Sequence, residues 1–473
     1  MKVCVLLPDY STSNVDYQNY DPPRDLSKLL LSDIVDTVFL NKLTTYKQLQ
    51  NLSKKRYDIY VNLCEGYLDW SVPSIDVIYS LELLNLPYTG PNLNLYDPTK
   101  ELMKYVAFCA NIKTPSYQII QNVVELDKVN IPFPLFIKPA KAGDSLGIDK
   151  NSLVNNQQEL INQTNFLLKE FDEILVEEYI DGREFTVLVI ANADGKTCKA
   201  LTPVEYIFPN NYTYKTYQLK TSELHTNANI AVEDVQLKNE LCIAAENIFT
   251  AFNGVGYARL DFRMNEKGEL FFLEINFTCS VFYEDGYEGS ADYILKFDGT
   301  SKTDFLKHII NEGITRYQRR QKPFVMKGNS INGYGIYALK NINKGEVIFK
   351  GEEKAQRLVT KQFVEENWNE KEKENFARYA YPISNNVFIL WDENANEWAP
   401  QNHCCTPNTA YFGLNVVALT NISKYEELTL DYAQLLNESA QEFKCTCKSE
   451  FCRGTIYGTI KNSLEMRLSN ELI

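Results

Sequence analysis

The pattern of apolar residues changes near Gln321, and this change limits the fold of the chain more than any other feature. Before Gln321, strand-like apolar runs alternate with helix-like stretches, which is typical of an α/β protein. After Gln321, the runs are short and are separated by glycine-containing turns. The chain has 473 residues, and roughly 150 residues per domain gives about three structural units. We therefore expect a multi-domain α+β protein with a boundary near Gln321.

The alternation predicts individual elements in the first part of the chain. A buried strand is expected over residues 3–7. Further strands are predicted at residues 59–63, 117–120, 135–138, 175–178, 184–191, 257–264 and 270–275, and helices at residues 74–85, 99–110 and 304–320. In the second part, residues 360–379 predict one polar helix, whose interleaved Glu and Lys indicate a solvated surface insertion.

Charge and cysteine content restrict the partners of the chain. A formal net charge of -14 argues against general binding to nucleic acid or to an anionic membrane, because such binding needs clustered Lys and Arg. The N-terminal apolar run stops at Pro8, too early for a membrane span or a signal-peptide core. The sequence therefore predicts a cytoplasmic protein, in which the 11 cysteines serve as thiols or metal ligands rather than disulfides.

Two predicted strands carry polar residues at alternate positions. Arg259 and Asp261 lie on one strand, Glu274 and Asn276 on the next, and a turn at residues 265–268 joins them. Residues two apart on a strand share a face, so a hairpin can present these oxygen atoms together. Oxygen ligands suit Mg²⁺ held between protein and nucleotide phosphates. The alternative is ordinary surface-strand chemistry, which the pair of motifs alone does not exclude.

A loop of small residues follows Lys138 and reads Pro139-Ala140-Lys141-Ala142-Gly143-Asp144-Ser145-Leu146-Gly147. Backbone N–H groups of such a loop can cover phosphates. This loop, together with residues 176–187, 259–262 and 274–276, resembles the D-alanine:D-alanine ligase branch of the ATP-grasp superfamily. The segments 86–90 and 97–100 belong to the same resemblance, which covers about residues 55–300.

The resemblance implies an ATP-grasp fold of three α/β subdomains, with an N-terminal subdomain at residues 1–95 and the central and C-terminal subdomains at residues 96–320. ATP would phosphorylate a carboxylate, and an amine would then attack the acyl phosphate while Arg259 stabilises the oxyanion. The residues implied to bind ATP are Lys100, Lys138, Ser145 and Lys220 at the phosphates, Glu177 and Ile180 at the adenine edge, and Glu184 at the ribose. Two Mg²⁺ ions would be held by Asp261, Glu274 and Asn276. The related ligases are commonly dimeric, so the resemblance also allows a homodimer.

Four departures from the family pattern concern the amino-acid side of this site. Residues 8–12 replace the family's glycine-rich turn and its substrate-orienting glutamate. Asp144 stands at the family's serine, Thr221 at its tyrosine, and Cys279-Ser280 at its Pro-Gly. We therefore expect the ATP and metal chemistry to be kept with small-molecule amino acid or peptide substrates, but not with D-alanyl-D-alanine as the product.

The C-terminal cysteines have the spacing of a metal site. Cys445, Cys447 and Cys452 follow the pattern C-x-C-x4-C, and Cys405 is available upstream. Four thiolates form a closed tetrahedral Zn²⁺ site that can stabilise a segment too small for a core of its own. The alternative is a set of free buried thiols.

The segments around these cysteines resemble a second family. Residues 333–338, 402–408 and 426–432, in that order before the cysteines, resemble a SET domain with its post-SET zinc segment, the fold of protein-lysine methyltransferases. The resemblance implies a β-rich SET fold at residues 321–440 and a zinc-bound tail at residues 441–473. The implied roles are S-adenosylmethionine binding by Gly335, Asn402 and His403, orientation of the lysine amine by Tyr432, and zinc binding by Cys405, Cys445, Cys447 and Cys452.

Cys404 stands where many members of the SET family have serine. Leu430 replaces the usual Phe or Tyr, which predicts a roomier pocket able to make di- or trimethylated product.

Three functions remain open from the sequence. The first is a bifunctional enzyme that forms an amide between amino-acid-like partners and N-methylates a lysine-type amine. The second is a protein-lysine methyltransferase whose ATP-grasp region is a platform for a lysine-bearing protein or peptide. The third is a non-catalytic, zinc-stabilised interaction protein.

Overall fold

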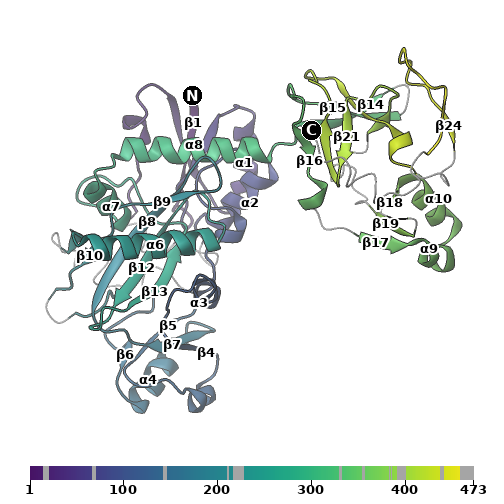
Figure 1. The fold of residues 1–473 in the computed structure, drawn as a ribbon. Coiled ribbons are helices and arrows are strands. Elements are labelled where there is room, and N and C mark those ends of the chain that lie inside the picture. Colours follow the sequence, from purple (N-terminus) through teal and green to yellow (C-terminus); the bar gives the residue numbers. More distant parts are fainter. Residues whose placement is uncertain are drawn as a thin grey trace. The chain divides into compact units, whose positions relative to one another are not determined.

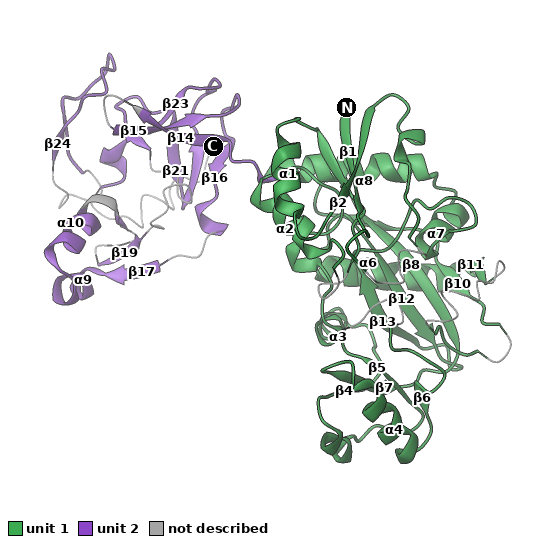
Figure 2. Cartoon of the chain, turned by 180° about the vertical axis from the view of Figure 1, so that it is seen from behind, with its two compact units in different colours: residues 1–319 green, residues 320–473 purple. Residues whose placement is uncertain are grey.

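The structure is a computed structural model. It describes residues 1–13, 21–66, 71–141, 146–209, 212–216, 228–329, 333–353, 357–382, 384, 386–390, 401–436 and 442–458. The chain divides into two compact units, unit 1 (Met1–Arg319) and unit 2 (Arg320–Ile473), which are coloured separately in Figure 2. Each unit is described by itself below.

Unit 1 begins with a three-stranded parallel sheet in the order β2-β1-β3. Its strands are β1 (Lys2–Pro8), β2 (Ile34–Leu40) and β3 (Ile59–Asn62), and the neighbouring helices are α1 (Thr45–Ser53) and α2 (Ile75–Leu83). Residues 3–6 of β1 are fully buried because the strand lies in the middle of the sheet. The loops after β1 and β3 leave from the same edge, since the carboxyl ends of parallel strands meet there.

A four-stranded antiparallel sheet follows, in the order β4-β7-β5-β6. Its strands are β4 (Tyr117–Ile120), β5 (Leu135–Pro139), β6 (Leu153–Val154) and β7 (Ile174–Glu178). Helix α4 (Gln157–Leu167) packs Leu160 and Leu167 against Ile137 and Val176 of this sheet. The opposite face of β5 and β7 carries Lys138 and Glu177, which belong to the site described below.

The third sheet of unit 1 has six strands, in the order β11-β10-β8-β12-β13, with β9 paired to β8. Its strands are β8 (Arg183–Ala191), β9 (Cys198–Ala200), β10 (Val204–Tyr206), β11 (Asn229–Ala231), β12 (Tyr257–Met264) and β13 (Leu270–Asn276). Strand β8 is buried on both faces, with Leu188 and Ile190 in one apolar cluster and Val187 and Val189 in another. Such a continuous apolar run is what a central strand requires.

Helices cover both faces of this third sheet. They are α3 (Lys100–Cys109), α6 (Val235–Ala251), α7 (Ser290–Asp298) and α8 (Lys302–Arg320). Figure 1 shows α6 lying across β8 and β12, where Leu241 and Ile248 join the cluster of Phe262. Helix α8 packs Phe305 and Ile309 into the cluster that also contains Val3 and Val5, so the first and third sheets share one core.

Unit 2 consists mainly of short strands. They are β14 (Phe324–Asn329), β15 (Gly333–Ala338), β16 (Val347–Phe349), β17 (Arg357–Thr360), β18 (Tyr381–Pro382), β19 (Val387–Leu390), β20 (Asn402–His403), β21 (Thr409–Phe412), β22 (Asn415–Ala418), β23 (Glu427–Leu430), β24 (Phe443–Lys444) and β25 (Thr455–Ile456). They form sheets of the orders β14-β15-β23-β20, β16-β22-β21, β17-β19-β18 and β24-β25. The pair β20 and β23 is parallel, with His403 opposite Leu430.

The polar helix predicted over residues 360–379 is two helices, α9 (Lys361–Asn367) and α10 (Glu370–Tyr379). The chain is extended at Trp368, and Asn369 then caps α10 by accepting a hydrogen bond from Glu372 N, while Glu372 accepts one from Asn369 N. This reciprocal cap starts a new helix. The segment is not purely a solvated surface insertion. Val364 packs with Phe388 in a small apolar cluster.

The elements predicted for the first part of the chain are confirmed, each with its ends within two residues of the prediction. The hairpin turn at residues 265–268 is confirmed as well, with Gly268 N donating to Asn265 O at 3.0 Å. A search of the described residues finds no helix that is both long enough and apolar enough to cross a membrane.

Candidate active sites

The hairpin of β12 and β13 places acidic, basic and amide side chains on one face. Asp261 lies opposite Glu274, and Arg259 lies opposite Asn276. Arg259 Nε and Nη2 donate to Asp261 at 3.3 and 3.1 Å, and Asn276 Nδ2 donates to Glu274 Oε1 at 3.3 Å. Because residues two apart share a face, all four side chains reach the same side of the hairpin. The cluster expected from the sequence is therefore assembled.

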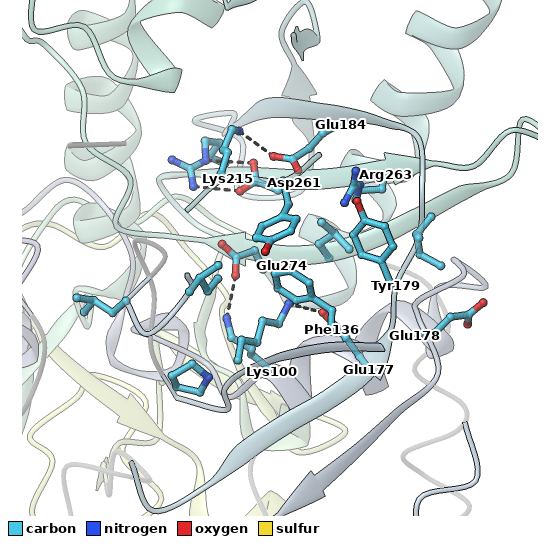
Figure 3. Close-up of a pocket in the computed structure, with 18 of the residues that line it drawn as sticks. Lys100, Phe136, Glu177, Glu178, Tyr179, Glu184, Lys215, Asp261, Arg263 and Glu274 are labelled. Carbon is cyan, nitrogen blue, oxygen red and sulfur yellow. Dashed lines mark hydrogen bonds and ion pairs between the residues drawn. The ribbon is translucent and has the colours of Figure 1, made fainter. Parts of the chain in front are cut away.

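A second set of ion pairs lies on β5, β7 and α3. Glu177 of β7 pairs with Lys138 of β5 through Oε1 and with Lys104 of α3 through Oε2, the latter at 2.8 Å. Lys100, at the start of α3, reaches the hairpin and lies 2.8 Å from Glu274 Oε2. Figure 3 shows Lys100 and Glu274 joined across the pocket, with Phe136 and Glu177 beside them. Two sheets and one helix thus enclose a single pocket.

Burial and charge act against each other in these groups. Burial alone would raise the pKa of Glu177, but the two ammonium groups outweigh it and hold this pKa at about 2. Burial lowers the pKa of Lys104, and Glu177 opposes that change only in part. Burial also opposes the charge of Lys100, yet Glu274 raises the pKa of Lys100 overall. Glu177 is therefore ionised at neutral pH, with its charge balanced by two ammonium groups.

The other end of the pocket combines aromatic rings with a further ion pair. The rings of Phe136 and Tyr214 meet edge to face at 4.9 Å between centroids, and Phe136 also stacks near Tyr179 at 6.1 Å. Lys215 Nζ lies 2.9 Å from Glu184 Oε1. Apolar rings next to a carboxylate with a cation partner can accept a flat base and the hydroxyl groups of an attached sugar.

Among the residues that the structure describes, the charges of the pocket lining balance. Five basic side chains of this described lining are Lys100, Lys138, Lys215, Arg259 and Arg263. Five acidic side chains line it as well, namely Glu177, Glu178, Glu184, Asp261 and Glu274. A polyphosphate entering such a pocket would take over the lysines and leave carboxylates without partners, unless it brought a cation. The opposed oxygens of Asp261 and Glu274, with Asn276 next to Glu274, are the donor set that a hard divalent cation prefers.

Most of the residues expected at this site therefore lie together. Lys100, Lys138, Glu177, Ile180, Glu184, Arg259, Asp261 and Glu274 all line the pocket, and Asn276 bonds to Glu274. Ser145, Lys220, Asp144 and Thr221, for which the sequence also makes predictions, lie outside the described residues. Sequence reasoning missed Lys104 and Lys215. Lys104 could have been found, because it is four residues after Lys100 and so shares its helix face.

In unit 2, Gly335 and Asn402 both lie against the carboxylate of Glu427. A Cβ atom on Gly335 would lie 2.4 Å from Glu427 Oε1, so a larger residue would have to displace that carboxylate. Asn402 Nδ2 donates to Glu427 Oε1 at 2.8 Å and to Tyr334 O at 2.6 Å. The three neighbouring strands β15, β23 and β20 thus hold the two residues expected at a cofactor in fixed positions.

His403 and Tyr432 contact each other next to this network. Tyr432 N donates to His403 Nδ1 at 3.1 Å, and the rings lie 5.5 Å apart between centroids. The Tyr432 hydroxyl donates to Gln401 O at 2.6 Å, which sets the direction of the phenol. Gln401, which sequence reasoning missed, is buried and its side chain accepts a hydrogen bond from Thr409. Leu430 is buried beside these groups.

The four cysteines expected to bind metal are brought together. The sulfur atoms of Cys405, Cys445, Cys447 and Cys452 all lie within 4.8 Å of one another. The Cys405 and Cys445 sulfurs are 3.7 Å apart, close to the edge of about 3.8 Å that a tetrahedron with Zn–S bonds of about 2.3 Å has. Burial opposes ionisation of Cys405, but the N–H of Arg453, which donates to its sulfur at 3.4 Å, helps to lower its pKa. The donor set fits Zn²⁺.

Two routes connect this cysteine cluster to Tyr432. His403 Nε2 lies 3.4 Å from Cys405 Sγ, while the other ring nitrogen receives Tyr432 N–H. Arg453, the residue after Cys452, forms an ion pair with Asp431, which in turn caps the short helix that starts at Tyr432. The position of Tyr432 therefore depends on groups that contact or adjoin the cysteine cluster.

Comparison with known proteins assigns a class to each unit. Residues 102–281 match the model of the D-Ala-D-Ala ligase C-terminus, and residues 333–433 match the model of the SET domain. Unit 1 is therefore an ATP-grasp ligase-type structure, and unit 2 contains a methyltransferase-type domain. The chain is an enzyme that combines both.

Two sequence relatives of this chain are D-alanine–D-alanine ligases. The chain is 28% identical to the D-alanine–D-alanine ligase of Enterococcus hirae over 254 residues, which are 51% of this chain and 67% of the relative. It is 30% identical to the ligase of Aquifex aeolicus over 201 residues, 41% of this chain and 64% of the relative. A crystal structure of the Bacillus anthracis D-alanine–D-alanine ligase with ATP superposes with a TM-score of 0.49 at 19% identity, covering 68% of this chain and all of that one. Residues 102–281 thus carry a domain of the D-Ala-D-Ala ligase C-terminal type, and residues 333–433 carry a SET domain.

Proposed function

We propose that the chain is a bifunctional enzyme, an ATP-dependent carboxylate-amine ligase joined to an S-adenosylmethionine-dependent N-methyltransferase. The observation that carries the ligase half is the pocket of unit 1, where Lys100 and Lys138 meet an oxygen-ligand cluster. The proposed boundaries are residues 1–95 and 96–320 for the ligase, 321–440 for the SET domain and 441–473 for the zinc segment.

The ligase reaction needs the two walls of the pocket for different tasks. Lys100 and Lys138 would contact the phosphates of ATP, exchanging their present partners Glu274 and Glu177 for phosphate oxygens. Asp261, Glu274 and Asn276 would hold Mg²⁺, which supplies charge neutralisation during phosphoryl transfer. The substrate carboxylate takes the terminal phosphoryl group and releases ADP. The amine nitrogen then bonds to the carbonyl carbon and inorganic phosphate leaves.

Arg259 has the position of an oxyanion stabiliser in this scheme. Its side chain is largely buried and is held by Asp261, so it does not have to be reoriented when negative charge develops. Glu184, paired with Lys215, would bind the ribose, and Phe136 with Ile180 would pack on the base. No histidine base is needed.

The methyltransferase reaction depends on positioning. Gly335, Asn402 and His403 would line the S-adenosylmethionine site, and Tyr432 would orient a neutral lysine-type amine toward the sulfonium methyl group. The phenol is already fixed by Gln401 O, so little reorganisation is required. Cys405, Cys445, Cys447 and Cys452 would hold Zn²⁺, a structural ion that keeps the segment next to Tyr432 in place.

The alternative function, a protein-lysine methyltransferase with unit 1 as a binding platform, leaves the pocket of unit 1 unexplained. A platform has no need to bury Lys104, Lys138 and Glu177 together, because desolvating charges costs free energy.

The function is tested with the full chain, ATP, Mg²⁺ and pairs drawn from the D- and L-amino acids. Release of ADP and a product mass equal to the two substrates minus water would support the ligase. A parallel assay follows transfer of a labelled methyl group to lysine and to each ligation product. No ADP release with any pair would reject the ligase half, and no methyl transfer to any of these amines would reject the other half.

A further inference from the structure

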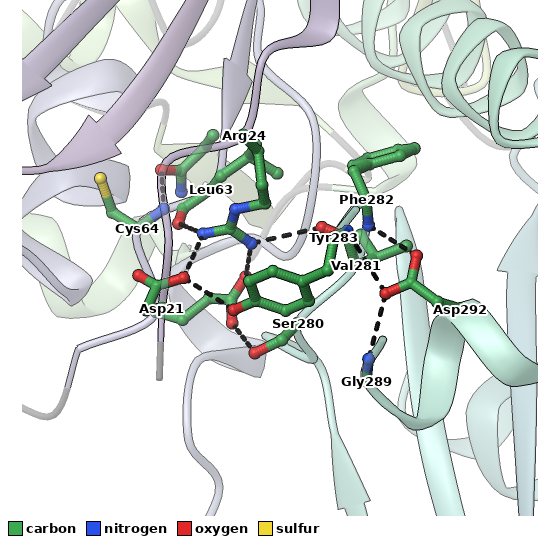
Figure 4. Close-up of polar contacts among 12 residues, drawn as sticks. Asp21, Arg24, Leu63, Cys64, Ser280, Val281, Phe282, Tyr283, Gly289 and Asp292 are labelled. Atoms are coloured by element: carbon green, nitrogen blue, oxygen red, sulfur yellow. Dashed lines mark hydrogen bonds and ion pairs between the residues drawn. The ribbon is translucent and has the colours of Figure 1, made fainter. Parts of the chain in front are cut away.

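A buried polar cluster lies outside the pocket residues described so far. It contains Asp21, Arg24, Glu65, Ser280 and Tyr283, which come from three separate loops of unit 1. Arg24 donates to Asp21 at 3.0 Å and to Glu65 at 3.1 Å, and Ser280 Oγ donates to Glu65 Oε2 at 2.5 Å. Tyr283 OH donates to Asp21 Oδ1 at 2.7 Å. Figure 4 shows Arg24 between Asp21 and the ring of Tyr283, with Ser280 alongside.

Two of the loops that form the cluster lie at the edge of the parallel sheet β2-β1-β3 where a ligand is expected to bind. Glu65 follows β3, and Asp21 and Arg24 lie between β1 and β2, so the residues leave the carboxyl edge of the parallel sheet. Ligands of open α/β sheets bind outside this edge. Ser280 and Tyr283 follow β13, the strand that carries Glu274 and Asn276.

The cluster also borders the ligase pocket. Cys279, the residue before Ser280, interacts electrostatically with both Arg259 and Glu65. Ser290 lines the same pocket as Arg259, and its neighbour Gly289 lies so close to Ser280 that a Cβ there would be 3.3 Å from the Ser280 carbonyl oxygen. The Arg259 end of the pocket, where the acyl group would react, therefore meets the Glu65 cluster.

The charges of the cluster do not balance. Asp21 and Glu65 contribute two carboxylates, whereas Arg24 is the single cation bonded to them among the described residues. Residues 14–20 and 67–70, which flank these loops, contain no lysine or arginine. Burial, and then the charge of Asp21, raise the pKa of Glu65 to about 7 despite Arg24 and Ser280. With both carboxylates ionised, the described part of the cluster is short of one positive charge.

Glu65 is not saturated by its two partners. An ionised carboxylate has about four acceptor positions, and Glu65 uses one for Arg24 and one for Ser280 among the described contacts. Its side chain keeps 11% exposure, in contrast to 1% for Arg24. Arg24 Nε is buried and has no hydrogen-bond partner among the described residues. Glu65 and Arg24 therefore each keep hydrogen-bonding positions that no described residue uses.

We propose that Glu65, held by Arg24 and Ser280, binds the ammonium group of an amino-acid substrate on the Arg259 side of the ligase pocket. This inference rests on the proposed ligase function and assigns the recognition group that the altered N-terminal loop does not provide. The ligand class is a compound with both an amine and a carboxylate, rather than a hydroxy acid.

Binding by Glu65 has a thermodynamic signature. An incoming cation lowers the pKa of a carboxyl group that titrates near pH 7, so binding at pH 7 should release up to about half a proton per site. The charged groups facing Glu65 are Arg24 and Asp21. The neutral titratable groups near it are Cys64, Tyr96, Tyr257, Cys279 and Tyr283, whose pKa values burial raises out of this range.

The test measures binding calorimetrically on the full chain with Mg²⁺ and a non-hydrolysable ATP analogue. The probes are the D and L forms of alanine, serine, glutamate and lysine, each compared with its α-hydroxy acid. We expect at least one amino acid to bind, the hydroxy acids not to bind, and binding at pH 7 to release protons into the buffer. Glu65→Gln should weaken amino-acid binding roughly 10- to 100-fold, the effect of losing a charged hydrogen bond.

Glu312→Gln is the matched control. Glu312 is also buried, pairs with Arg316 at 3.6 Å in unit 1, and has a pKa raised by burial. The control should bind the probes as the unchanged chain does, with a similar loss of thermal stability in both variants. Unchanged affinity in Glu65→Gln, equal binding of hydroxy acids, or no binding of any probe would overturn the proposal.

ADP release separates this inference from the ligase function. If amino acids bind through Glu65 and no pair yields ADP, the ammonium site stands and the ligase function fails. If ADP forms with the same KM in Glu65→Gln as in the unchanged chain, the ligase function stands and the ammonium site fails.

Discussion

Unit 1 and unit 2 differ in how much apolar structure supports their candidate sites. Among the described residues, the two largest apolar clusters of unit 1 contain 23 and 20 buried residues, whereas the largest in unit 2 contains 10. The segment that carries Cys445, Cys447 and Cys452 contributes no residue to that cluster of 10. Unit 1 can therefore hold its pocket by packing alone, while for the tail of unit 2 we expect a metal ion to hold the residues beside Tyr432.

The largest expected effect comes from removing the metal ion. Cys447→Ser, or a strong chelator, should release the β24–β25 segment and reduce methyl transfer about 100-fold or more, since both routes to Tyr432 begin at the cysteines. ATP binding by unit 1 should not change. Bound zinc is measured by atomic emission, and methyl transfer and ATP binding are measured on the same sample.

Cys404→Ser is the control for this prediction, because Cys404 lies outside the four-sulfur group. Full methyl transfer after complete zinc removal would show that unit 2 does not depend on the ion. That result would contradict the proposed difference between a unit held by packing and a unit held by a metal ion.

A substitution in unit 1 should have the reverse selectivity. Asp261→Ala removes an expected Mg²⁺ ligand and leaves Arg259 without its partner, so ligation should fall roughly 100- to 1,000-fold. Methyl transfer to a free lysine substrate should stay within about twofold. Glu269→Gln, at the exposed turn of the same hairpin, is the control. Equal loss of both activities would argue for one shared site.

A smaller effect is expected from Arg453. Arg453→Ala removes the ion pair with Asp431 and should lower kcat for methyl transfer about 10-fold, with little change in KM and with zinc retained. Arg453→Lys should restore part of kcat, because it keeps the charge. A change in zinc content instead of kcat would assign Arg453 to metal binding only.

Acid should affect unit 1 through Glu177, the most compensated carboxylate of its pocket. Its pKa of about 2 lies below that of an unfolded glutamate, so its contribution, on the order of 3 kcal/mol, is present above about pH 4.5. That contribution is lost as the pH falls from about 4.5 toward 2. Glu177→Gln should flatten the pH dependence of the unfolding midpoint in this range, and an unchanged slope would contradict the assignment.

The smallest effect tests the break between α9 and α10. Asn369→Ala removes the cap of α10 and should destabilise unit 2 by about 1 kcal/mol. Denaturant unfolding followed by tryptophan fluorescence, with Gln362→Ala on the exposed face of α9 as the control, measures this change. An equal decrease in the free energy of unfolding in both variants would show that the cap at Asn369 adds no stability of its own.

The two units also differ in what the sequence could predict. Alternation was enough to put Arg259 with Asp261 on one face of β12 and Glu274 with Asn276 on one face of β13. The turn alone would pair Asp261 with Leu273, and a register shift between Asp261 and Phe262, which the sequence did not reveal, brings Glu274 opposite Asp261. The cysteine spacing was likewise enough for the four-sulfur group. Helix α6 went unpredicted although Leu237, Leu241 and Ile248 are spaced for one helix face.

Other parts of the site could not be predicted, because they depend on tertiary contacts. Glu65 and Arg24 are 41 positions apart and meet Ser280 from a third loop, and no local spacing links these loops. The same holds for Arg453 and Asp431, which are 22 positions apart. The break at Trp368 was missed because a polar pattern continues through it and only the cap at Asn369 marks the new helix.

The most direct test of the two-site function follows ADP release and methyl transfer in the full chain, in Asp261→Ala and in Tyr432→Phe. Each variant should lose one activity and keep the other: Asp261→Ala should abolish amino-acid-dependent ADP release, and Tyr432→Phe should abolish methyl transfer. Absence of ADP release from the unchanged chain with every amino-acid pair, while methyl transfer continues, would contradict a bifunctional enzyme.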